Sequence, residues 1–191
     1  MKKLILTVWS ISFFSRKERN LKKKLTNELT LYKTNIFPFN SKKVSDKKYV
    51  VTIGIGGNIG DVKKTFNKLF LSLKNNSHFH ILSTSPLLEN PAFGYTEQKD
   101  FLNGIIMLKT NLAPNEFLKI MQRLEIRYGR KRSFQDAPRT LDIDIVFFDN
   151  KKIITKKLII PHKDWANRES VIIPLNYMKN NKIYKTYKGR K

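Results

Sequence analysis

Residues 141–148 constrain the fold most strongly, because acidic and apolar side chains alternate at their start (Asp142, Ile143, Asp144, Ile145). Alternation with period two is typical of a β-strand, so the two acids are expected on one face and the two isoleucines on the other. Carboxylates side by side on one strand face repel each other unless a cation lies between them. The pattern by itself leaves two interpretations open: an edge strand with a solvated acidic face, or a strand whose acids bind a cation.

Magnesium suits Asp142 and Asp144, because it takes one or two carboxylates, keeps several waters and fills its shell with substrate phosphate oxygens. Arg139 precedes the pair and carries a planar guanidinium that can grip phosphate through two donors. Such a set predicts phosphoryl-type transfer on a nucleotide, where catalysis consists mainly of positioning and charge neutralisation. A solvated basic loop is the alternative interpretation of the cations, which also include Arg130, Lys131 and Arg132 before the strand and His162 and Arg168 after it.

The composition limits the kinds of chemistry that the 191-residue chain can carry. There is no cysteine, which excludes disulfides, thiol chemistry and cysteine zinc sites, and the three histidines argue against a multi-histidine metal centre. The formal net charge of +23 is concentrated at the two ends: residues 1–50 hold 13 Lys and Arg against 3 Asp and Glu, and residues 151–191 hold 12 against 2. Nucleic acid is therefore not expected as a partner, despite the charge.

The N-terminal region predicts an extension to the main domain. Residues 1–14 resemble a secretory signal only weakly, because no small-residue cleavage site follows, and the run is too short to span a bilayer. We expect a cytoplasmic protein without a membrane segment, and a monomer. Residues 1–48 are expected to form a basic extension with a helix around residues 16–31 and a linker over residues 41–48, and residues 49–191 the main domain.

The main domain alternates strand and helix patterns in the order strand–helix–strand–strand–helix–strand. This order is the ferredoxin-like βαββαβ pattern, which predicts an α+β fold with an antiparallel sheet and helices on one face. The expected strands are residues 49–55, 78–88, 100–110 and 141–148; the expected helices are residues 62–73, 113–128 and a short final one over residues 166–178, broken near Pro174.

Several spaced motifs occur in one order along residues 51–178: Gly57-Asn58-Ile59-Gly60-Asp61, Phe101-Leu102-Asn103, Glu125 with Gly129-Arg130, Pro138 through Asp144, and Pro161-His162 through Asn167-Arg168. Together they resemble the 6-hydroxymethyl-7,8-dihydropterin pyrophosphokinase family of folate biosynthesis. The resemblance implies a ferredoxin-like fold. It also implies an enzyme that transfers the β,γ-diphosphate of ATP to the hydroxymethyl oxygen of the pterin and releases AMP.

The same resemblance implies roles for individual residues. Asp142 and Asp144 would hold two magnesium ions, and Arg130 and Arg139 would steady the phosphates as catalytic residues, the first from a loop that closes over ATP. The remaining ATP-binding residues would be Glu125, Lys157, His162 and Arg168. The substrate-binding residues would be Asn90, Pro91, Phe93, Phe101 and Asn103, together with Asp142.

An aromatic ring suits the pterin because it can stack on a flat bicycle, and an amide can both donate to and accept from its edge. From the residues alone, a phenylalanine such as Phe101 is more often a core residue, and an asparagine such as Asn103 an ordinary polar residue of a strand. Two aromatics that are common in the family are absent. Gln135-Asp136 stand where a tryptophan often precedes the Pro-Arg pair, and Glu169 and Ser170 follow Arg168.

Two other classes of function stay open from the sequence. Ferredoxin-like sheets can bind RNA, and the ends of the chain are basic, but no RNP-like arrangement of aromatics is found and paired acids repel a nucleic-acid backbone. The second alternative is a family member that has lost activity and keeps nucleotide binding.

Overall fold

The computed structural model describes residues 21–92, 94, 97–130 and 137–178. The fold is α+β, with an antiparallel seven-stranded sheet in the order β1-β2-β5-β6-β3-β7, in which β4 also pairs with β6, and a small β8–β9 hairpin. The strands are β1 (Lys22–Lys24), β2 (Thr30–Tyr32), β3 (Tyr49–Gly57), β4 (Phe79–Thr84), β5 (Leu87–Asn90), β6 (Phe101–Thr110), β7 (Asp142–Phe148), β8 (Ile153–Ile154) and β9 (Ile159–Ile160); the helices are α1 (Val62–Lys74), α2 (Pro114–Arg127) and α3 (Glu169–Asn176).

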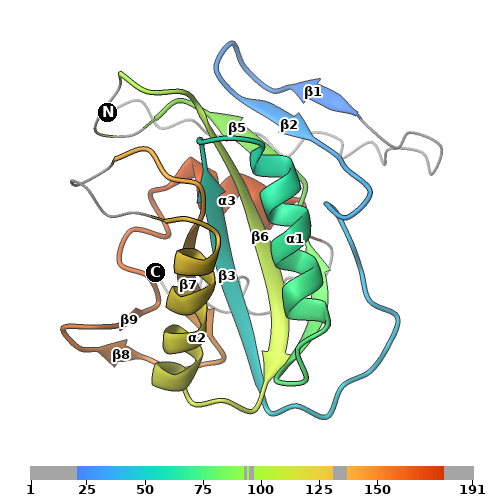
Figure 1. The fold of residues 1–191 in the computed structure, drawn as a ribbon, viewed down its shortest axis with the longest axis vertical. Helices are drawn as coiled ribbons and strands as arrows, with labels where there is room; N and C mark the ends of the chain where they lie inside the picture. Colours follow the sequence, from blue (N-terminus) through green and yellow to red (C-terminus); the bar gives the residue numbers. More distant parts are fainter. Residues whose placement is uncertain (1–20, 93, 95–96, 131–136, 179–191) are drawn as a thin grey trace.

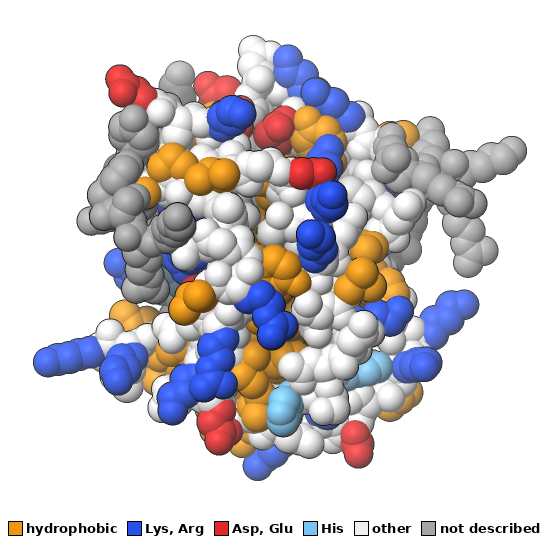
Figure 2. Space-filling model, in the orientation of Figure 1, with side chains coloured by type: hydrophobic (Ala, Val, Ile, Leu, Met, Phe, Trp, Pro, Cys, Tyr) orange, Lys and Arg blue, Asp and Glu red, His pale blue; other side chains and the backbone are white. Residues whose placement is uncertain are grey.

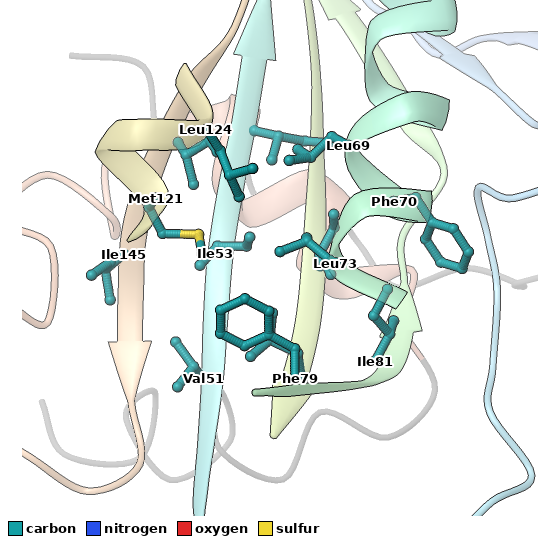
Figure 3. Packing of buried hydrophobic residues seen from close by; sticks show 14 of the residues in the cluster. Val51, Ile53, Leu69, Phe70, Leu73, Phe79, Ile81, Met121, Leu124 and Ile145 are labelled. Carbon is teal, nitrogen blue, oxygen red and sulfur yellow. The ribbon is translucent and has the colours of Figure 1, made fainter. Parts of the chain in front are cut away.

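The centre of the sheet is β3, which is rich in β-branched residues and pairs with β6 on one side and β7 on the other. Its alternate residues Val51, Ile53 and Ile55 are buried on one face. On that face α1 and α2 pack side by side, and their apolar stripes complete the main core (Figures 1 and 3). Helix α1 begins after Asp61, whose side chain caps it by accepting from the backbone N–H of Lys64 at 2.9 Å.

The prediction of helices on one face holds for α1 and α2 but not for α3, which lies on the opposite face of the sheet (Figure 1). The reason is that β6 is apolar on both faces: Ile106 and Leu108 contact the main core, while Ile105 and Met107 form a second cluster with α3. A sheet with two apolar faces needs a cover on each. The helix is also shorter than expected, and Pro174 lies inside it.

The expected single strand over residues 78–88 is two strands, β4 and β5, separated at Ser85-Pro86. Proline lacks the N–H that a continuous ladder requires. Ser85 instead exchanges hydrogen bonds with Ile105 of β6, through its backbone N–H and its hydroxyl, both at 2.9 Å. Both strands still pair with β6, so the break shifts the register without separating the chain from the sheet.

The expected helix over residues 16–31 is wrong for the part that the structure describes, residues 21–31. These residues form β1, a turn and the start of β2, and β2 pairs with β5 so that the sheet is extended by a hairpin (Figure 1). Leu21, Leu25 and Leu29 have helical spacing, but pairing with a strand more than 50 residues away overrides this local pattern. After the hairpin, Phe37 is fully buried in the main core.

None of the helices in the described part of the chain is long and apolar enough to cross a membrane.

Candidate active site

The acidic pair lies on β7, the strand at one edge of the large sheet. As predicted, Ile143 and Ile145 are buried in the main core, while Asp142 and Asp144 are only partly buried, on the opposite face. Both acids line a cavity of about 660 Å³ on that side of the sheet. The alternation of residue types along the strand therefore separates core from cavity.

Glycines on the neighbouring strand keep the floor of this cavity open. Gly54 is paired with Asp144 and Gly56 with Asp142 in the β3–β7 register. On the other side of β3, Gly56 is paired with Asn103 of β6. An acid, a glycine and an amide thus lie in one row across three adjacent strands, with no side chain standing between the acid and the amide.

Asp142 is held between two arginines. Its Oδ2 accepts from Arg139 Nη1 at 2.6 Å, and its Oδ1 pairs with Arg130 Nη2 at 2.8 Å. Arg130 in turn donates to the carboxylate of Glu125 on α2, which also accepts from the backbone N–H of Ile143 at 2.7 Å. Glu125 is thus buried beneath the site, and its contacts connect α2 to β7.

Asp144 has far weaker cationic neighbours. Arg168 Nη1 lies 3.7 Å from its Oδ2 and Arg168 Nη2 lies 3.6 Å from Asp164, so one exposed arginine is shared between two acids. Burial and the nearby Asp142 carboxylate raise the pKa of Asp144, although His162 and Arg168 act in the other direction. A bound cation would remove the repulsion that raises this pKa.

The donor set fits magnesium. The described residues hold no group of three or more His, Cys, Asp and Glu side chains able to enclose a metal. Magnesium needs no such cage, because it commonly uses one or two carboxylates with water and phosphate oxygens. Asp142 and Asp144 are neighbours on one face, both line the cavity, and oxygen is the ligand atom that magnesium prefers.

Arg139 is positioned by Asn58, which lies in the turn between β3 and α1. Asn58 Oδ1 accepts from the backbone N–H of Arg139 at 2.9 Å, and the backbone N–H of Asn58 donates to the Arg139 carbonyl at 2.9 Å. The Nδ2 of the same asparagine donates to Gln98 and to the carbonyl of Lys99. The buried Asn58 amide thus connects the segment before β7 to the loop before β6.

An aromatic ring and two amides form another part of the cavity wall. The Arg139 guanidinium lies 5.2 Å from the centre of the Phe101 ring. Asn103 Nδ2 donates to Asn90 Oδ1 at 2.7 Å, and Pro91 lines the cavity beside them. Phe101 is only partly buried, so it is a wall residue and is not part of the core clusters.

The other expected site residues fall into three groups. His162 and Arg168 line the cavity; the backbone N–H of His162 donates to Val146 of β7 at 3.0 Å. Lys157, between β8 and β9, is exposed and does not line the cavity. Phe93 lies outside the described residues, as does the loop over residues 131–136 that contains Lys131 and Arg132.

The structure also brings to the site residues that sequence reasoning did not select. Asn58 lies in the motif Gly57–Asp61 and Asp164 between His162 and Asn167, so the spaced motifs already indicated that both are near the site. Glu28, from the N-terminal hairpin, lines the same cavity and carried no signal in the sequence.

Comparisons with known proteins agree with this geometry. The family model described as 7,8-dihydro-6-hydroxymethylpterin-pyrophosphokinase (HPPK) matches residues 52–180. Three relatives bear the name 2-amino-4-hydroxy-6-hydroxymethyldihydropteridine pyrophosphokinase. The protein of Campylobacter jejuni is 45% identical over 143 residues (75% of this chain and 91% of that protein), that of Helicobacter pylori 41% over 144 residues (74% and 88%), and that of Bacillus subtilis 34% over 126 residues (66% and 75%). The chain belongs to the HPPK family.

Proposed function

We propose that the protein transfers pyrophosphate from ATP to 6-hydroxymethyl-7,8-dihydropterin, giving the pterin diphosphate and AMP in folate biosynthesis. One observation carries the proposal: the acidic pair, Arg139 and Arg168 share one cavity with the aromatic-amide wall, from which the acids are separated only by the glycine strand β3. Family membership supplies the reaction, and the cavity supplies a place for both substrates.

In this proposal the phosphates bind on the β7 side. Asp142 and Asp144 would hold two magnesium ions, which would supply charge neutralisation and orientation to the triphosphate. Arg139 and Arg130 keep the Asp142 carboxylate in place and present guanidinium donors to phosphate oxygens. His162 and Arg168 also line the cavity, and Arg168 adds positive charge beside Asp144. Glu125 acts indirectly: its carboxylate positions Arg130 and the start of β7.

The pterin binds on the β5–β6 side. The Phe101 ring offers a flat apolar surface for stacking, and Asn90 and Asn103 offer amides to the edge of the bicycle. With the pterin there, its hydroxymethyl group points across Gly56 toward the acidic pair. The hydroxymethyl oxygen forms a bond to the β-phosphorus and its proton passes to water. The bond between that phosphorus and the oxygen bridging to the α-phosphate breaks, and AMP leaves with that oxygen.

Asp144→Asn tests the proposal by changing one carboxylate to an amide of equal size. We expect wild-type protein to release AMP from MgATP only when the dihydropterin is present, and the variant to lose at least about 100-fold in kcat, because the amide is neutral and a poorer magnesium ligand. AMP formation is measured by chromatography. Asp46→Asn makes the same change on an exposed acid outside the cavity and should behave as wild type.

The outcomes separate the alternatives. Absence of AMP from folded wild-type protein that still binds MgATP would identify an inactive family member. Absence of both AMP and nucleotide binding would favour a binding module, with RNA as the first ligand to try. On the face drawn in Figure 2, Lys and Arg side chains are spread from top to bottom between acidic, apolar and uncharged ones.

The organisation of the whole chain is part of the proposal. We propose that β3, α1, β4/β5, β6, α2 and β7 form a ferredoxin-like unit within a catalytic domain of residues 49–191, extended by residues 1–48. Support comes from the strand order and from the family match, which begins at residue 52. Cytoplasmic location and a monomeric state stay predictions of the sequence.

A further inference from the structure

The N-terminal hairpin lies outside the residues that the family model matches, yet it reaches the site. The match covers residues 52–180, whereas β1, its turn and β2 span residues 22–32. Strand β2 pairs directly with β5, in the register Thr30 opposite Glu89. Strand β5 ends at Asn90, which begins the proposed pterin wall. The hairpin therefore extends the sheet on the side where the pterin is proposed to bind.

Side-chain contacts fix the hairpin on the domain. Leu29 and Leu31 are buried in one cluster with Leu88 of β5 and Ile173 of α3. The Tyr32 hydroxyl donates to Glu89 at 2.7 Å. An apolar contact to α3 and a strand pairing to β5 hold the hairpin from two directions, so its turn has a defined position.

The turn of the hairpin directs Glu28 to the cavity. The hydroxyl of Thr26 accepts from the backbone N–H groups of Glu28 at 3.2 Å and Leu29 at 3.0 Å, which closes the turn. Leu29 points into its cluster, while Glu28 is exposed and lines the cavity with Asn90 and Pro91. Within the described part of the chain, no cation lies within 4.0 Å of the Glu28 carboxylate.

The other carboxylates of the cavity are positioned for different tasks. Asp142, Asp144 and Asp164 pair with arginines. Glu169 stands in the first turn of α3, directly after Arg168 on the phosphate side. Glu28 is the acid that comes from the turn of the hairpin, whose strand β2 pairs with β5 next to the pterin wall. An unpaired carboxylate beside a bound heterocycle is an acceptor for N–H groups.

We propose that Glu28 is a specificity-determining residue for the pterin, and that its carboxylate accepts hydrogen bonds from the 2-amino group and the neighbouring ring N–H. The inference rests on the proposed function, because it takes the dihydropterin as the substrate. Two adjacent N–H donors match the two oxygens of a carboxylate, so the contact distinguishes a 2-amino heterocycle from one without that group.

Glu28→Gln tests this role, since it keeps the size of the side chain and removes its charge. We expect the KM for the dihydropterin to rise about tenfold, the loss typical of a charge-assisted hydrogen bond, with kcat and the KM for MgATP unchanged. The melting temperature should equal that of wild type, because Glu28 is exposed and forms no ion pair with the described residues. Asp46→Asn, the same charge change elsewhere in the N-terminal segment, should leave all of these values unchanged.

A substrate analogue without the 2-amino group identifies the contact. Wild-type protein should bind the analogue about tenfold more weakly than the dihydropterin, and Glu28→Gln should add little further loss, because both changes remove one interaction. Calorimetric binding in the presence of a non-hydrolysable ATP analogue gives these values without turnover. Equal pterin affinity in wild type and Glu28→Gln would overturn the proposal for Glu28. Pterin binding that depends on Glu28 without any AMP formation would support it and overturn the proposed reaction.

Discussion

At the scale of single residues, the absence of a side chain at Gly56 is as important to the cavity as the acids. A Cβ at this position would lie 2.7 Å from Asn103 Oδ1, closer than real contacts allow. A Cβ at Gly54, two residues earlier on the same face, would meet Val146 at 3.5 Å, an ordinary contact. A side chain at Gly56 would therefore displace the Asn103 amide, whereas one at Gly54 would fit beside Val146.

We predict that Gly56→Ala displaces the Asn103 amide and weakens dihydropterin binding by about tenfold, because the hydrogen bond to Asn90 and the amide's position are both lost. Calorimetric titration with the dihydropterin measures the effect. Gly54→Ala is the matched control and should retain pterin affinity within about twofold, since its Cβ meets only ordinary van der Waals distances. Equal losses in the two variants would show that Asn103 is not the sensitive group.

At the scale of elements, the hydrogen bond from the Tyr32 hydroxyl to Glu89 reports whether the N-terminal hairpin is docked on β5. Burial, and then the hydrogen bond and charge of Glu89, raise the pKa of Tyr32 from 10.0 to about 12. A raised pKa means that the folded state holds the proton more tightly than the unfolded state. The resulting stabilisation is present below pH 10 and is lost as the pH rises toward 12.

Tyr32→Phe should therefore remove a late step from the alkaline titration of the tyrosines, followed by absorbance near 295 nm. The difference in unfolding free energy between wild type and variant should stay constant below about pH 10 and shrink above it, because only the protonated phenol donates to Glu89. A wild-type titration in which Tyr32 ionises with the exposed tyrosines would show that the hairpin is not docked against β5 in solution.

At the scale of the whole molecule, α1, α2 and the sheet share one core. Phe117 of α2 is fully buried and contacts Phe79 of β4 and Phe148 of β7 edge-on, with ring centres 5.6 and 5.8 Å apart. Figure 3 shows labelled side chains of α1, α2, β3, β4 and β7 that meet in the same core. Because no element has a core of its own, the described domain should unfold as one unit.

Phe117→Ala should lower the free energy of unfolding by about 3–5 kcal/mol, because it removes a ring from a core that cannot collapse around the gap. Urea denaturation followed by circular dichroism and by tryptophan fluorescence should give coincident transitions. Ile126→Ala on the same helix is the control: this side chain is 72% exposed, so its loss should change stability by less than about 0.5 kcal/mol. Separate transitions for the two probes would contradict a shared core.

Local patterns in the sequence were sufficient for the elements that carry the site. The alternation over Asp142–Phe148 gave the strand, its faces and the cation-binding interpretation, and the apolar stripes gave α1 and α2 to within a few residues. Such patterns are readable because strand and helix periods are properties of the backbone itself. The spaced motifs added the family, which the comparisons confirm.

Only the tertiary structure decided which distant segments meet. It turned the expected helix at residues 21–31 into a hairpin, placed α3 on the second face of the sheet, and left Lys157 away from the cavity. It also brought Glu28 to the same cavity as Asn90, although 62 positions separate them in the chain. Strand pairing and cavity walls depend on partners far apart in sequence, so no local period encodes them. The sequence by itself determined that two carboxylates stand on one face of a strand; the fold decided what surrounds them.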